Sequence, residues 1–344
     1  MMLMTTRRRA LQRLAALAAG AASLRAVAAS PAKRIGILSE GAAEPGKATL
    51  NWEPDFWEAM AQRGWVVGRN VVVERAFASW RSDRLPALAD ELVKKRVDLI
   101  VSFGDQDAMV AAARATRTIP IVLFDAFDPV EGGLVESLAR PGRNVTGISL
   151  VRGPEFALKR LEYLRAVAPD AKRLAWLWGH ERTLAARVDG SGYDIADWLA
   201  TAAKKMQFET VVYRVTTAAA IDRALADAKS RGVQALTANG FPIYLARRAV
   251  VDFALRERLP SAFAYGGFVE DGGLLSYAAA DAEADLLFRR WVEYVDRILR
   301  GAKPAEMPVI AADRYDLQIN LRTAATLGLT IPPSILSRAD ALVR

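Results

Sequence analysis

Short runs of β-branched and other apolar residues alternate with helical patterns along the chain, and this alternation predicts an α/β protein. In the first half, five such runs predict buried strands over residues 34–38, 71–74, 98–102, 119–124 and 145–149. The clearest helix between them covers residues 84–95, where apolar side chains recur on one face behind a possible cap at Asp83. Strict alternation of strand and helix predicts a parallel sheet that is covered on both faces.

The pattern then starts again and predicts a second unit of the same kind. Its expected helices are residues 155–167, 195–206, 218–230 and 243–258, and its expected strands are residues 173–178, 209–215 and 233–237. No long Gly/Ser linker separates the two units. We therefore expect two doubly wound lobes joined by crossing segments, with a ligand site in the cleft between them.

The first thirty residues have the character of an export signal. Three arginines at 7–9 precede a weakly apolar, alanine-rich stretch from Leu14 to Leu24, with small residues at Ala28 and Ala29 and no acidic residue. The segment around the arginines resembles a twin-arginine signal, so we expect residues 1–29 to be a signal peptide and the mature chain to be periplasmic. An amphipathic N-terminal helix is the alternative interpretation.

Export changes the charge balance of the chain. The formal net charge is +8, but residues 1–28 hold five arginines and no acids, which leaves +3 for the mature protein. Its remaining charges are interspersed, so we expect no nucleic-acid partner. The body of the chain has no apolar run long enough to cross a bilayer, and without cysteine it has no site for a lipid anchor, a disulfide or a thiolate metal centre.

Enzyme motifs find little support. No Gly-x-Gly-x-x-Gly follows a predicted strand, Gly-x-Ser-x-Gly is absent, and His180 is the only histidine. We therefore predict no catalytic residues, no metal and no cofactor. An enzyme on the same fold is a weaker alternative, and Asp105 with Asp128 is its one candidate acid–base pair.

Ligands in open α/β sheets bind beyond the carboxyl ends of the strands, and polar residues follow several of the predicted strands. In the first unit we expect ligand contact from the strand-end positions, with Asp128 also placed to start a helix. Acids near residues 104–107 would accept hydrogen bonds and repel an anion, so the ligand group that reaches this loop is expected to carry an amine or hydroxyl. The candidates are Ser39, Glu40, Gly104, Asp105, Gln106, Asp125 and Asp128.

The second unit supplies His180, Asn239 and Tyr265 as candidate ligand contacts by the same logic. A solvated histidine and an Asn-Gly turn are the ordinary alternatives for the first two. Aromatic residues near loops are candidates for stacking on a planar ligand: Trp52, Trp80, Phe241 and Tyr265. The ligand is therefore expected to be a small molecule, amine-bearing or aromatic.

Several long motifs occur in an order that is specific to one family. They include residues 85–93, 119–122, 128–130, 133–147, 272–277, 294–299, 301–304 and 327–333. Over about residues 33–342 the chain resembles ABC-transporter substrate-binding proteins of the type I periplasmic-binding fold, a family that includes tryptophan-binding members. The sequence departs from the family pattern at Gly104–Asp107 and Gly179–His180, where ligand contacts are expected, so the resemblance does not carry an amino-acid ligand over to this chain.

The resemblance implies two lobes joined by three crossovers, and a permease and an ATPase as partners. It places the crossovers near residues 147–150, 264–266 and 309–313. Lobe 1 would then hold residues 30–148 and 266–310, and lobe 2 residues 149–265 and 311–344. A solute-binding component of an ABC importer is the function implied, and an exported binding module for a sensor or receptor is the alternative.

Overall fold

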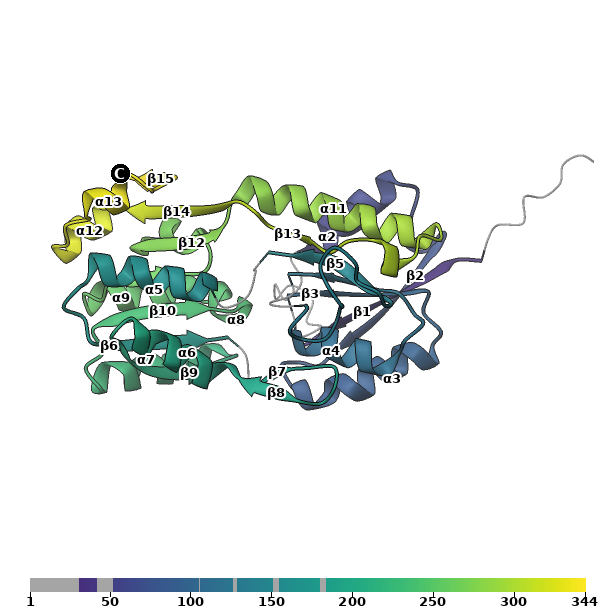
Figure 1. Cartoon of the computed structure of the whole chain (residues 1–344), viewed down its shortest axis with the longest axis horizontal. Coiled ribbons are helices and arrows are strands. Elements are labelled where there is room, and N and C mark those ends of the chain that lie inside the picture. The colour runs from purple at the N-terminus through teal and green to yellow at the C-terminus, as the bar shows by residue number, and fades with distance from the viewer. Residues whose placement is uncertain (1–30, 42–51, 105, 126–128, 151–154, 180–183) are drawn as a thin grey trace, which may run out of the picture.

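The computed structural model describes residues 31–41, 52–104, 106–125, 129–150, 155–179 and 184–344. These residues form two α/β lobes that lie side by side along the long axis of the molecule (Figure 1). The predicted fold class is therefore confirmed. The expected signal peptide lies outside the described residues.

Lobe 1 is built on a six-stranded parallel sheet of order β13-β5-β4-β3-β1-β2. The central strands are buried along nearly their whole length because helices cover both faces, as their continuous apolar runs predict. Its strands are β1 (Lys33–Ser39), β2 (Val71–Phe77), β3 (Leu99–Phe103), β4 (Ile121–Phe124), β5 (Val145–Ser149) and β13 (Ile310–Ala311). Its helices are α2 (Trp52–Gln62), η1 (Ser82–Arg84), α3 (Leu85–Lys94), α4 (Gln106–Ala115), α11 (Asp281–Leu299) and η2 (Pro304–Glu306).

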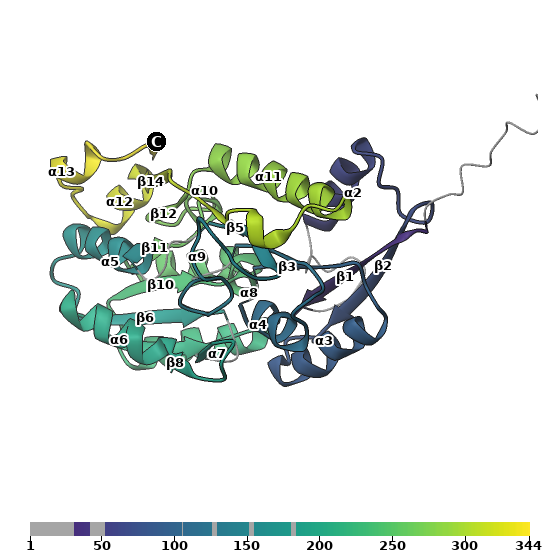
Figure 2. The same cartoon turned by 45° about the vertical axis from the view of Figure 1, so that its right-hand side comes forward.

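Each face of this sheet has its own apolar core. Helices α3 and α4 cover one face, while α2 and α11 cover the other (Figures 1 and 2). Trp291 of α11 is fully buried at the centre of the second core, where its ring meets those of Trp52, Phe56 and Phe124. Trp52 also stacks on Phe103, so it belongs to this core and is not free to stack on a ligand.

Lobe 2 has a seven-stranded sheet of order β15-β14-β12-β11-β10-β6-β9. Its pairs are parallel except β12 with β14, which makes the sheet mixed. Its strands are β6 (Arg173–Trp178), β9 (Glu209–Arg214), β10 (Ala235–Asn239), β11 (Ser261–Phe263), β12 (Leu275–Ala279), β14 (Tyr315–Asn320) and β15 (Ala341–Val343). Its helices are α5 (Glu155–Val167), α6 (Ile195–Lys205), α7 (Ala218–Ser230), α8 (Phe241–Leu245), α9 (Arg247–Arg256), α10 (Gly267–Glu270), α12 (Leu321–Leu327) and α13 (Pro333–Leu336).

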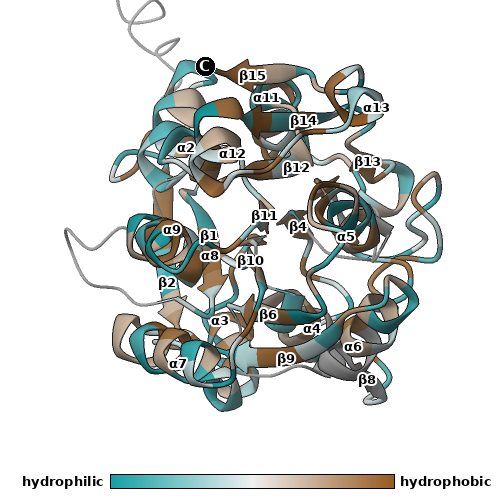
Figure 3. Ribbon diagram, turned by 90° about the vertical axis from the view of Figure 1, so that its left-hand side faces the viewer, coloured by the Kyte–Doolittle hydropathy of each residue, from teal (hydrophilic) through white to brown (hydrophobic). Residues whose placement is uncertain are grey.

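The two faces of the second sheet are also covered by different helices. Residues of α5, α6, α12 and α13 form one core, and residues of α7, α8, α9 and α10 form the other. Figure 3 looks at this lobe end-on and shows strands with mainly hydrophobic residues between the helices. Helix α12 begins at Asn320, whose side chain accepts a hydrogen bond from the Thr323 amide, and ends at Gly328 in the left-handed conformation.

The chain passes between the lobes three times, after β5, after β12 and between β13 and β14. The second passage differs from the prediction, which put residues 266–310 in lobe 1 with the crossover near residues 264–266. Strand β12 pairs in parallel with β11, so residues 266–279 belong to lobe 2 and the chain crosses near Ala280. The segment from β13 to β14 runs from one lobe to the other beside α11 (Figure 1).

Three local predictions are also wrong. Asp83 does not cap α3 with its side chain, because it lies inside the preceding 3₁₀ turn. The segment after Asp128 forms turns, not a helix, and closes at Gly133 with φ of 67°. The helix expected over residues 243–258 breaks at Ala246 into α8 and α9.

A short hairpin was not predicted at all. Strands β7 (Leu184–Ala186) and β8 (Gly192–Asp194) form an antiparallel pair between β6 and α6. The hairpin starts from lobe 2 and reaches α4 of lobe 1 (Figure 1). Asp189-Gly190 at its turn is the sequence signal that would have predicted it.

Candidate functional site

The carboxyl ends of strands from both sheets face each other between the lobes (Figure 1). We call this region the strand-end site. It is defined by the predicted contacts at those ends that the structure describes: Ser39, Glu40, Gly104, Gln106, Asp125, Asn239 and Tyr265. Three further predicted contacts, Asp105, Asp128 and His180, lie outside the described residues. Ligand contact by any of these ten residues stays a prediction.

Ser39 and Glu40 end β1 and are both almost completely buried. The hydroxyl of Ser39 accepts a hydrogen bond from the Gly41 amide at 3.1 Å, and the carboxylate of Glu40 accepts one from the Ser82 hydroxyl at 2.5 Å. The Glu40 carbonyl also accepts a bond from the Trp80 amide. These bonds hold the loop after β2 against the end of β1, so both residues have a clear structural role.

Gln106 is the first residue of α4 and lies next to the end of β3. Its side-chain oxygen is buried and accepts no hydrogen bond from the described residues. Gly104 precedes it with φ of 72°, and its amide donates to the Phe124 carbonyl at 2.8 Å, which ties the ends of β3 and β4 together. A buried acceptor without a donor is unusual in a folded protein and suits a site that is completed by a ligand.

Asp125 follows β4 in the left-handed conformation, with φ of 62°. Few non-glycine residues adopt this conformation, and such backbone strain is most common at functional sites. Its amide donates to the Ile148 carbonyl at 2.9 Å. This bond joins the ends of β4 and β5 and places Asp125 at the carboxyl edge of the lobe 1 sheet.

Tyr265 lies two residues beyond β11 in lobe 2, with its ring centroid 5.1 Å from that of Tyr244. Burial raises the pKa of Tyr265, and the negative charge of Asp125 raises that pKa further. Asp125 belongs to lobe 1 and Tyr265 to lobe 2, so this charge effect acts between the two halves of the strand-end site.

Asn239 ends β10, and its side-chain oxygen accepts a hydrogen bond from the Trp176 indole at 2.6 Å. The two glycines that follow β6 and β10 pack against each other. A Cβ on Gly240 would lie 2.6 Å from the Cα of Gly179, and Gly240 has φ of 107°. Only glycine fits both positions, so the backbones of two strand ends approach closely here.

Sequence reasoning missed Arg160 of α5, which is only 7% exposed. Its Nε is buried without a hydrogen-bond partner among the described residues, and burial lowers the pKa of Arg160 to about 10. The positive charge of Arg160 lowers the pKa of Tyr265, so the two groups interact. The sequence does carry a signal, because Arg160 lies on the same helical face as Ala157 and Leu164, where an apolar residue is expected.

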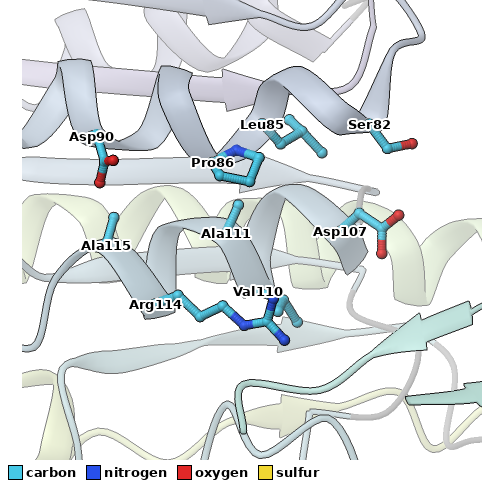
Figure 4. A pocket seen from close by; sticks show the side chains of 9 residues that line it. All are labelled: Ser82, Leu85, Pro86, Asp90, Asp107, Val110, Ala111, Arg114 and Ala115. Atoms are coloured by element: carbon cyan, nitrogen blue, oxygen red, sulfur yellow. The ribbon is translucent and has the colours of Figure 1, made fainter. Parts of the chain in front are cut away.

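Hollows large enough for a ligand also occur away from the strand-end site. A groove of about 220 Å³ runs between α3 and α4 of lobe 1, with Ser82 and Asp107 at one end and Asp90 at the other (Figure 4). A second hollow of about 480 Å³ lies between the 130–133 turn and the β7–β8 hairpin. Both are lined by charged residues at the surface, and neither contains a residue of the strand-end site.

The β7–β8 hairpin binds lobe 1 through its backbone. The Val188 amide donates to the Gly132 carbonyl at 3.0 Å, and the Arg114 guanidinium donates to the carbonyls of Arg187 and Val188. Arg187 also forms an ion pair with Glu131. The hairpin therefore links the lobes on the side opposite to the β13–β14 passage (Figure 1).

Comparison with known proteins identifies this arrangement of lobes. The model of one family, described as ABC transporter substrate binding protein, matches residues 48–343. The chain belongs to the ABC transporter substrate-binding protein family. Members of this family bind small-molecule substrates and work with ABC transporter components; they are binding proteins, not enzymes.

Individual relatives agree with this assignment. A tyrosine-binding protein of Clostridioides difficile (strain R20291) is 26% identical over 275 residues, which cover 80% of this chain and 75% of the relative. Two solved structures have the same fold with a TM-score of 0.68 and 23% identity. They are a conserved domain protein of Vibrio cholerae, with 90% of this chain and 99% of that chain covered, and an ABC domain of Streptococcus pneumoniae in complex with L-Trp, with 91% and 100% covered.

The described residues add two observations. No helix among residues 52–104, 106–125, 155–179 or 184–344 combines the length and apolar character needed to cross a membrane. Within the described part of the chain, no three residues of the types that ligate metals are grouped so that they could hold an ion.

Proposed function

We propose that this substrate-binding protein is exported to the periplasm, closes its lobes on a small organic solute at the strand-end site, and delivers the solute to an ABC permease and ATPase. The observation that carries the proposal is that Asp125 and Tyr265 follow strands β4 and β11 at the facing carboxyl ends of the two sheets, and the effect of the Asp125 charge on the pKa of Tyr265 agrees with this placement. A ligand bound there would contact both lobes and stabilise the closed form.

Aromatic amino acids are the first solutes to test. Relatives of this chain are named for tyrosine binding or crystallised with L-Trp. In this chain the rings of Tyr265 and Tyr244 lie together on the lobe 2 side, and on the lobe 1 side Gln106 has a buried acceptor without a donor among the described residues and Asp125 has a carboxylate. A zwitterionic aromatic solute would suit both sets of groups.

Binding is tested by thermal unfolding of the mature protein with a panel of amino acids, amines, aromatic acids and nucleobases. We expect at least one solute to raise the melting temperature, to bind in calorimetry and to be recovered unchanged. Asp125→Asn is expected to weaken that binding, whereas Asp170→Asn is a control, since Asp170 is exposed at the opposite, amino end of β6. Binding that is insensitive to Asp125→Asn would remove the strand-end site from the proposal, and conversion of the solute to a product would replace transport with catalysis.

Export is tested on the arginine-rich N-terminal segment. Mass spectrometry of the periplasmic fraction should find a mature protein that begins near Ser30. Replacement of Arg7 and Arg8 by lysine should retain the precursor in the cytoplasm. A wild-type protein that stays in the cytoplasm with residues 1–29 attached would refute export without affecting the solute-binding function.

A further inference from the structure

Arg160 differs from the other residues on the inner side of α5. This helix packs on β11 and β12, and its buried stripe of Ala157, Leu161 and Leu164 belongs to the apolar core of lobe 2. Arg160 falls on the same stripe and is 7% exposed. A guanidinium at such a position needs partners, because charged groups are rarely buried unless they are paired.

No such partners are present among the described residues. The Nε of Arg160 is buried without a hydrogen bond, and none of the hydrogen bonds or ion pairs within the described part of the chain involves its side chain. Burial lowers the pKa of Arg160, and the opposing effect comes from Tyr265 and not from a carboxylate. Among the described residues, the buried Nε of Arg160 therefore has no hydrogen-bond partner, and no carboxylate forms an ion pair with its guanidinium.

Arg165 on the same helix shows how a structural arginine is satisfied in this lobe. Its guanidinium donates to four backbone carbonyls at 2.7–2.9 Å, and it lies over the ring of Phe208 with its Cζ 3.8 Å from the ring centroid. The carbonyls that accept these bonds belong to Met206, Pro169, Ala171 and Gln207. The two arginines lie five positions apart in one helix, so the missing partners of Arg160 are a local feature.

The position of Arg160 connects it to the strand-end site. Helix α5 is the first element of lobe 2 after the chain leaves β5. Arg160 lies in the second turn of α5, which packs on β11, the strand that ends two residues before Tyr265. In agreement with this placement, the charge of Arg160 lowers the pKa of Tyr265. A solute held between Asp125 and Tyr265 would therefore lie within reach of electrostatic interaction with Arg160.

We infer that Arg160 binds a carboxylate group of the solute, an inference that rests on the proposed function of this site. A guanidinium presents paired N–H donors that match the two oxygens of a carboxylate, and a bidentate pair would satisfy the buried charge. A phosphate, with its greater negative charge, would be disfavoured by the nearby Asp125 carboxylate. The solute is therefore an organic carboxylate, with its carboxylate directed to lobe 2 and its donor groups directed to Asp125 and Gln106 of lobe 1.

The test compares solutes that differ only in this group. The probes are L-tyrosine with L-tyrosinamide, L-tryptophan with L-tryptophanamide, and benzoate with benzamide, each titrated into the mature protein by calorimetry. We expect the protein to bind a carboxylate at least tenfold more tightly than the matching amide, since hydrogen bonds to charged groups discriminate by about 10- to 100-fold. In Arg160→Met this preference should fall below threefold, and Arg160→Lys should keep part of it.

The melting temperature of the solute-free protein separates a binding role of Arg160 from a structural one. If Arg160 serves binding, its unpaired charge destabilises the free protein, so solute-free Arg160→Met should melt at the same temperature as the wild type or higher. If Arg160 is structural, the variant should melt at a lower temperature. The matched control, Arg165→Met, should melt at a lower temperature and keep the preference for the carboxylate, because Arg165 is bonded only within lobe 2.

Three outcomes would overturn the inference. One is a wild-type protein that binds amides or amines as tightly as carboxylates, which would leave the solute-binding function intact. Another is an Arg160→Met variant that keeps the carboxylate preference, or that is destabilised as much as Arg165→Met. If the wild type binds no member of either panel, the proposed function itself fails, and the inference fails with it.

Discussion

Removing the side chain of Arg114 should favour separation of the lobes. Arg114 lies on α4 of lobe 1, and its guanidinium donates to the carbonyls of Arg187 and Val188 in the hairpin from lobe 2. Arg114→Ala deletes both bonds without changing the hairpin itself. If these contacts form only when the lobes are close, the variant should populate an open form more than the wild type does.

The magnitude follows from the exposure of these bonds. Hydrogen bonds to a charged group contribute about 1.5–3 kcal/mol when they are protected, but exposed pairs contribute much less, so we take about 1–2 kcal/mol for the two together. That free energy corresponds to a change of about 5- to 30-fold in the ratio of closed to open forms. Solute affinity should fall by up to the same factor, because only the closed form contacts the solute from both lobes.

The absence of cysteine from the chain makes the assay direct. Cysteines introduced at the exposed Arg69 of lobe 1 and the exposed Asp222 of lobe 2 can carry a fluorophore pair that reports the distance between lobes. Arg117→Ala is the matched control, because Arg117 is an exposed arginine near the end of α4 for which no bond to the hairpin is found in the described structure.

Two results would refute the reasoning about the hairpin. If Arg114→Ala and Arg117→Ala give the same distribution of distances as the wild type, the bonds of Arg114 to the hairpin do not hold the lobes together. If the distances change but solute affinity does not, the form with the docked hairpin is not the one that binds solute.

Three further predictions concern stability. Gly240→Ala should lower the free energy of unfolding in urea by about 2–4 kcal/mol, because its Cβ would collide with Gly179 and because φ is 107°; an unchanged midpoint would show that the strand ends can separate. Trp291→Ala should cost about 3–5 kcal/mol, since Trp291 is fully buried among aromatic rings of lobe 1; the same measurement checks it. Burial, and then a hydrogen bond to Asp227, raise the pKa of Tyr213 to about 12, so the folded state holds this proton more tightly than the unfolded state. The resulting stability is present below pH 10 and lost between about pH 10 and 12, and melting curves of Tyr213→Phe over that range should lack the part of the loss that comes from Tyr213.

Most of the fold could be predicted from local pattern. Strands β5 and β6 and helices α5 and α7 have the bounds that their apolar periodicity predicted, because each is a run of one period between clear breaks. Apart from the local errors at Asp83, after Asp128, at Ala246 and in the β7–β8 hairpin, the main failure was non-local. The pairing of β12 with β11 and β14 assigns residues 266–279 to lobe 2, and no local pattern encodes which sheet a short apolar run joins.

Ligand contact by the candidate residues stays a prediction, but the positions of several of them followed from the strand pattern. Asp125 and Tyr265 lie at facing strand ends, because the carboxyl ends of parallel strands gather at one edge of a sheet. The strand pattern could not single out Arg160, since that residue lies on the side of helix α5 and not at the end of a strand. Nor could it show that Glu40 is bonded to Ser82, a partner 42 positions away in the sequence.

Three of the residues considered for the strand-end site break local rules of protein structure. Asp125 adopts a backbone conformation that disfavours most side chains, Gln106 buries an acceptor without a donor, and Arg160 buries a charge without a counter-ion. Each feature is expected to cost stability in the free protein. A solute with a carboxylate and donor groups would bind both the guanidinium of Arg160 and the acceptor of Gln106. Part of its binding energy would then come from satisfying polar groups that have no partner in the described part of the free protein. Substitutions that repair such defects, such as Arg160→Met, should therefore preserve the fold while weakening binding.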